Sequence, residues 1–70
     1  MNANAIREFL RRQPFEPFVI RMSNGETHPV HHRECALVTQ RKIIVYDPDD
    51  DREVHCGLVQ INVVEALQAS

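Results

Sequence analysis

The sequence contains few of the residues that mark secreted or membrane-embedded proteins. It has two cysteines, no tryptophan, one tyrosine and three phenylalanines in 70 residues. Two cysteines are too few for the disulfide framework of a small secreted domain, so each is expected to be a small apolar group. No apolar run approaches the roughly 20 residues of a membrane span, and the amino terminus lacks the charged-then-apolar order of a signal peptide. We therefore expect a cytoplasmic protein with no membrane partner.

The composition is ordinary for a globular chain, with 43% apolar residues, 26% charged residues and a net charge of -2. A chain of this length has room for one core, and residues 1–70 are expected to form a single small domain. The charge is uneven, since residues 1–42 carry seven Arg or Lys against four Glu, and residues 43–70 carry one Arg against six Asp or Glu. A fold that mixes the two halves on its surface has neither a basic face nor an acidic one.

The first expected element is an amphipathic helix at about residues 4–13. Asn2 or Asn4 can cap its amino end, and Pro14 stops it. Glu8 and Arg12 have the spacing of a favourable helical pair. The aromatic residues that follow Pro14 are expected to tie the helix to the strands.

About five short antiparallel strands are expected in the part from about residue 18 to 67. They cover 18–22, 27–31, 35–39, 42–47 and a last segment from 53–56 into 59–67. Asn24-Gly25 predicts a turn with positive φ at both central residues, which pairs Met22 with Thr27 and Ile20 with Pro29. Residues 43–46 are apolar on both faces, so this strand is expected to be covered from both sides. The order of one helix and then short strands predicts a mainly β (α+β) fold closed into a small barrel.

The most distinctive stretch is Pro-Phe-Glu-Pro-Phe at 14–18, running on to Ser23-Asn24-Gly25. Residues 5–67 resemble a family of short uncharacterised bacterial proteins with this pattern, and that resemblance implies no activity. More loosely, the order of elements resembles small Sm-like and SH3-like barrels, including the bacterial Hfq-type RNA chaperones. Their Tyr-Lys-His signature is absent, because the final strand pair here reads Val54-His55-Cys56-Gly57-Leu58-Val59. The resemblance therefore implies a fold rather than an RNA site.

The histidine-rich segment supplies enough ligands for a metal by count, namely His28, His31, His32, Cys35, His55 and Cys56. On a strand, however, His28 points opposite to His31, and His55 points opposite to Cys56. No Cys-x-x-Cys pair is present either. The favoured interpretation is therefore surface histidines and buried cysteines, with no metal or other cofactor.

Neither calcium binding nor catalysis is favoured. Asp47, Asp49 and Asp51 match the start of a calcium-binding loop, but the required Gly and Glu positions hold Arg52 and Leu58. A solvated hairpin loop is the simpler interpretation. A cysteine with a histidine would make a nucleophilic pair, but no spacing in the sequence requires one. We expect the protein not to be an enzyme.

Nucleic-acid contact would use five basic residues, Arg7, Arg11, Arg12, Arg41 and Lys42. Tyr46 is the one aromatic residue left for stacking on a base, because the phenylalanines are expected in the core. The leading hypothesis is a non-catalytic module that contacts a protein partner or associates with itself as a homo-oligomer. The alternative is an Sm-like protein that binds single-stranded RNA.

Overall fold

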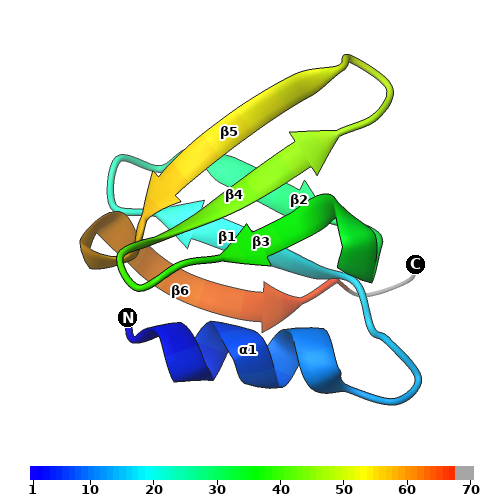
Figure 1. Cartoon of the computed structure of the whole chain (residues 1–70). Coiled ribbons are helices and arrows are strands. Elements are labelled where there is room, and N and C mark those ends of the chain that lie inside the picture. The colour runs from blue at the N-terminus through cyan, green and yellow to red at the C-terminus, as the bar shows by residue number, and fades with distance from the viewer. Residues whose placement is uncertain (68–70) are drawn as a thin grey trace.

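The computed structural model describes residues 1–67, which form one short helix and two antiparallel sheets (Figure 1). The mainly β fold with an N-terminal helix is thus confirmed. The elements in chain order are helix α1 (Ala3–Arg11), strands β1 (Phe18–Met22) and β2 (Thr27–Val30), 3₁₀ helix η1 (Arg33–Cys35), strands β3 (Ala36–Val38), β4 (Lys42–Asp47) and β5 (Arg52–Gly57), 3₁₀ helix η2 (Leu58–Gln60) and strand β6 (Ile61–Ala66).

Helix α1 is capped as predicted but is shorter than expected. The Asn2 Oδ1 atom accepts a hydrogen bond of 2.8 Å from the Ala5 amide, which satisfies one of the free donors of the first turn. The helix ends at Arg11, and Arg12 leaves the helical region with φ -58° and ψ 140°, two residues before Pro14, which cannot continue a helix. The predicted pair of Glu8 with Arg12 is wrong, since Glu8 lies 3.6 Å from Arg11 instead.

The turn between β1 and β2 differs from the predicted one by one residue. The Met22 amide donates to the Glu26 carbonyl at 2.8 Å and the Gly25 amide donates to the Met22 carbonyl at 3.0 Å. Of Asn24 and Gly25, Gly25 alone has a positive φ, at 91°, as in a three-residue hairpin loop. The predicted register is therefore wrong, and the opposed residues are Arg21 with Thr27, Ile20 with His28, Val19 with Pro29 and Phe18 with Val30.

The structure has six strands where about five were expected, arranged as β2-β1-β6 and β3-β4-β5. The expected last strand is broken by η2, so that β5 pairs with β4 and β6 pairs with β1. The expected strand at 35–39 is shorter, because Arg33–Cys35 forms η1. These ladders leave two open three-stranded sheets, so closure of the predicted barrel is not confirmed.

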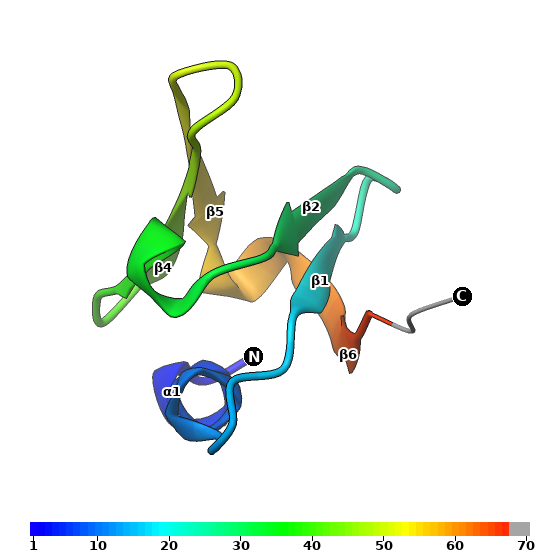
Figure 2. The same cartoon turned by 90° about the vertical axis from the view of Figure 1, so that its right-hand side faces the viewer.

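The core lies between the two sheets and is closed at one end by α1. Its fully buried side chains include Ile6 of α1, Phe18 and Ile20 of β1, and Ile43 of β4. Phe9 and Phe15 pack with ring centroids 5.2 and 6.1 Å from that of Phe18, which confirms the aromatic tie between helix and strands. Both views place α1 at the end of the molecule opposite the β4–β5 loop (Figures 1 and 2).

Strand β4 is not covered on both faces, which corrects a prediction. Ile43 and Val45 face the core and are buried, whereas Ile44 is half-buried and Tyr46 is 38% exposed. The reason is that α1 packs its apolar side into the same core and not over the outer face of this sheet. Leu37 of β3, which lies opposite Ile44, is 62% exposed.

Candidate functional site

Three of the four histidines and Cys35 line one groove between the two sheets. The other groups that line it are Tyr46, Asp47 and Asp49, together with apolar side chains that include Val45 and Val54. Its volume is about 570 Å³, within the range of small-ligand sites. The lining extends from Pro17 and the residues around the end of β2 to the β4–β5 loop.

The predicted separation of His28 from His31 is wrong. Strand β2 ends at Val30, so the alternation of side chains stops there, and His28, His31 and His32 all line the groove. The prediction for the other pair is confirmed, because Cys56 is 1% exposed while the side chain of His55 is 49% exposed. Neither of these two lines the groove.

The grouped histidines do not form a metal centre in this arrangement. Across residues 1–67, no three His, Cys, Asp or Glu side chains are placed to hold one ion. Two histidines lie near a carboxylate that is close in sequence: the His28 Nε2 atom lies 3.5 Å from Glu26 and the His55 Nε2 atom, outside the groove, lies 3.6 Å from Glu53. The groove thus brings three imidazoles next to apolar side chains.

The two cysteines lie in different environments. Cys56 is buried in β5 as expected, but Cys35 is half-buried at the end of η1 and not in a core strand, which corrects its predicted position. Both thiols are free. Burial, with a smaller effect from the Glu26 carboxylate, raises the pKa of the Cys56 thiol, so this thiol is a poor source of thiolate.

Two carboxylates of the β4–β5 loop accept hydrogen bonds from within the loop. The Asp47 Oδ1 atom accepts a hydrogen bond of 3.0 Å from the Asp49 amide, and Asp51 takes a left-handed backbone with φ 52°. The Tyr46 hydroxyl donates to the Asp51 Oδ1 atom at 2.9 Å. This hydrogen bond, together with slight desolvation and nearby negative charge, raises the pKa of Tyr46.

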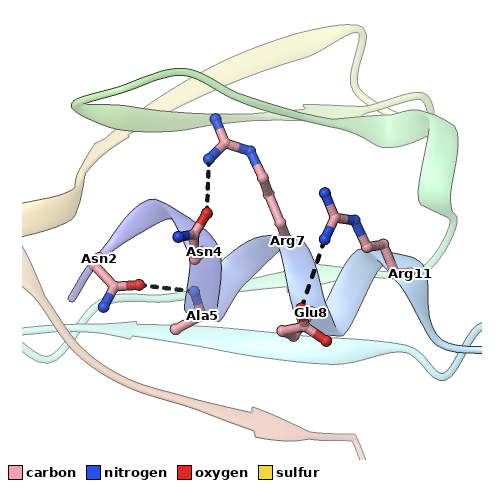
Figure 3. A network of polar contacts seen from close by, with 6 residues as sticks. All are labelled: Asn2, Asn4, Ala5, Arg7, Glu8 and Arg11. Atoms are coloured by element: carbon pink, nitrogen blue, oxygen red, sulfur yellow. Dashed lines mark hydrogen bonds and ion pairs between the residues drawn. The ribbon is translucent and has the colours of Figure 1, made fainter.

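The five basic residues considered for nucleic acid lie in two separate places, at α1 with the residue that follows it and at the β3–β4 turn. On the helix, the Arg7 guanidinium donates to Asn4 at 3.2 Å and Arg11 pairs with Glu8 (Figure 3). Arg12 lies 3.4 Å from Glu16 and stacks over the ring of Phe9. The arginines at 11 and 12 are thus already partnered by carboxylates.

Arg41 and Lys42 lie at the β3–β4 turn, where the Thr39 hydroxyl accepts from both backbone amides.

Sequence reasoning missed a structural role of Arg33. Its guanidinium donates to the Leu10 carbonyl and the Arg12 carbonyl, both at 2.7 Å, and it stacks 5.4 Å from the Phe15 ring centre. These carbonyls lie at the carboxyl end of α1, where a positive charge is favourable. No short-range pattern could predict the contact, since 21 and 23 residues separate the partners.

The outer edges of the two sheets differ in how open they are. The Leu67 amide donates to the Pro17 carbonyl, and the Leu58 amide to the Arg41 carbonyl. Along an antiparallel strand, an amide that donates to the partner strand alternates with one that points away from it. Since Leu58 and Leu67 donate inward, the residue before each of them and the alternate residues of β5 and β6 point their amides outward from the sheets. They are Glu53, His55 and Gly57 on β5, and Val64 and Ala66 on β6.

The opposite edge strands, β2 and β3, are less able to pair with another strand. By the same alternation the backbone nitrogen of residue 29 on β2 faces outward, and Pro29 has no N–H to donate there. Strand β3 has only three residues. Short edges and prolines are the devices by which proteins avoid pairing with other strands. The six-residue edges of β5 and β6 have no proline.

Comparison with protein-family models, curated proteins and solved structures finds no match for this chain. The resemblance to a bacterial family and to Sm-like barrels therefore stays a prediction. In the part of the chain that the structure describes, no helix is long and apolar enough to cross a membrane.

Proposed function

We propose that this chain is a non-catalytic module that associates with copies of itself through the open edges of β5 and β6. The observation that supports this most is the contrast between edges: β2 carries Pro29 outward and β3 is short, whereas β5 and β6 are six residues long and present three and two outward amides. An edge of this kind is a template for another strand.

An exposed apolar side chain lies between these two edges. Val59 in η2, which connects β5 to β6, is 91% exposed. Burial of an apolar side chain against a second copy would add to the hydrogen bonds of a strand pair. Pairing of β5 with β6 of the next copy gives a ring or a filament, while pairing of like edges gives a two-fold dimer.

Sedimentation analysis across a range of concentrations tests this proposal. We expect the wild-type protein to be larger than a monomer at high micromolar concentration, and Val59→Glu to weaken association by at least about tenfold, because the charge must be buried in the interface. Leu37→Glu is the matched control, since Leu37 is exposed on β3, away from both edges. A strict wild-type monomer, or dissociation by Leu37→Glu alone, would contradict the proposal.

Single-stranded RNA binding is the alternative function. It is favoured by Arg7, Arg41 and Lys42, for which no carboxylate within residues 1–67 forms an ion pair. Filter binding with mixed-sequence single-stranded RNA separates the two functions. Retention that weakens steeply with salt supports RNA binding, and no retention at low salt excludes it. The absence of catalysis and the cytoplasmic location stay predictions in either case.

A further inference from the structure

The groove between the sheets is a second surface, distinct from the open edges. Its wall on β5 is formed by Val54, which is half-buried on the inner face of that strand. The outward amides of the same strand belong to Glu53, His55 and Gly57. A ligand in the groove and a strand on the edge would therefore meet different parts of β5.

The floor of the groove suits an aliphatic chain. Val45 and Val54 lie opposite each other in the β4–β5 ladder, and Pro17, Pro29 and Pro48 add apolar surface around them. Polar groups make up the rest of the lining. An aliphatic stem that carries one polar head can lie on such a floor with its head at the polar side.

The formal charges of the groove lining, with histidine counted as neutral, all have one sign. Asp47 and Asp49 line the groove, and no arginine or lysine of residues 1–67 does so. The other titratable groups there are the three histidines, Cys35 and Tyr46. The ring of Tyr46 is held in place by the hydrogen bond from its hydroxyl to Asp51. The complement of this lining is a cation with a planar head and an aliphatic stem.

We propose that the groove binds the side chain of an arginine presented by an extended segment of a partner protein. The three methylene groups would lie on Val45 and Val54, and the guanidinium would meet the carboxylates of Asp47 and Asp49. A guanidinium also stacks on tyrosine and histidine rings and is less strongly hydrated than an ammonium. Arginine is therefore a better fit than lysine. This inference does not depend on self-association.

The chain provides a built-in probe for this site. Tyr46 is the only tyrosine and there is no tryptophan, so tyrosine fluorescence reports on this one residue of the lining. The ligand is the peptide acetyl-Gly-Arg-Gly-amide, which has no aromatic group. The control is the same peptide with citrulline, which has the shape of arginine but no charge. We expect a saturable change in Tyr46 fluorescence with the arginine peptide and at least about tenfold weaker binding of the citrulline peptide.

Two variants locate the binding. The double variant with Asp47→Asn and Asp49→Asn should weaken binding of the arginine peptide about tenfold. The loop should persist, because the Asn side-chain oxygen at position 47 can still accept from the amide of residue 49. Asp50→Asn is the matched control, because Asp50 lies in the same loop but does not line the groove, and it should change binding less than twofold. Equal binding of both peptides, no saturable change, or equal losses in the double variant and in the control would overturn the proposal.

Discussion

Arg33 links two segments that are far apart in the sequence. It donates two hydrogen bonds of 2.7 Å to carbonyls at the end of α1. Arg11 on the same helix has a different kind of contact, an ion pair of 3.6 Å with Glu8 in which both side chains are largely exposed. Hydrogen bonds from a charged donor contribute more than a solvated ion pair.

Replacement of Arg33 by alanine is expected to lower the free energy of unfolding by about 1 to 2 kcal/mol. The loss should be measured by urea denaturation. Arg11→Ala is the control and should change stability by less than about 0.5 kcal/mol. If both variants lose the same amount, the contact of Arg33 with the helix end does not stabilise the fold.

The cysteines give a second prediction, because only Cys56 is fully buried. Cys56→Ala should cost about 1 kcal/mol, through lost burial and a small cavity, and Cys35→Ala should cost less. The folded state holds the thiol pKa of Cys56 above the ordinary 9.0. The unfolded chain therefore releases this proton first, and the stabilising contribution is present below about pH 9 and is lost as pH rises beyond it.

Urea denaturation between pH 7 and 10 measures this effect. The wild-type protein and Cys35→Ala should lose more stability above pH 9 than Cys56→Ala. Parallel pH curves for all three proteins would show that Cys56 ionises as readily in the folded state as in the unfolded chain.

At the scale of elements, the β1–β2 hairpin depends on one glycine. Gly25 has φ 91° and an added Cβ would meet no atom within 4 Å, while Gly57 has an ordinary φ of -63°. Gly25→Ala should therefore cost about 1 kcal/mol from backbone strain alone. Gly57→Ala is the matched control and should stay within about 0.5 kcal/mol of the wild type. Equal effects in thermal denaturation would contradict the turn described here.

The elements were predictable where short-range signals act alone. The cap at Asn2 and the strand at 18–22 follow from local preference and alternation. The turn register was missed because Asn-Gly is compatible with both a two-residue and a three-residue loop. The break at η2 was missed because nothing in Leu58–Gln60 forbids a strand, and only the pairing of β6 with β1 shows that the chain changes sheets there.

The groove could be predicted only in part. The cluster of His28, His31, His32 and Cys35 is visible in the sequence, but strand alternation gave the wrong sides for His28 and His31. The fault was to continue the strand past Val30. The meeting of these side chains with Tyr46 and Asp47 depends on how the two sheets pack, which no local pattern specifies.

At the scale of the whole molecule, the two sheets and α1 enclose one small core. Among the described residues no polar side chain is buried without a partner. The polar groups left without a partner are therefore not in the interior but at the sheet edges, where β5 and β6 carry unpaired backbone amides next to the exposed Val59. In a chain of 70 residues with a small core, added pairing between copies would also contribute to stability.

Amide hydrogen exchange at several protein concentrations tests self-association through these edges most directly. We expect the outward amides of His55, Gly57, Val64 and Ala66 to be protected at high micromolar concentration and to lose that protection on dilution. The inward amides of Val54, Cys56, Val63 and Glu65 should be protected by their ladders at every concentration. Outward amides that exchange at the same fast rate at all concentrations would contradict the account.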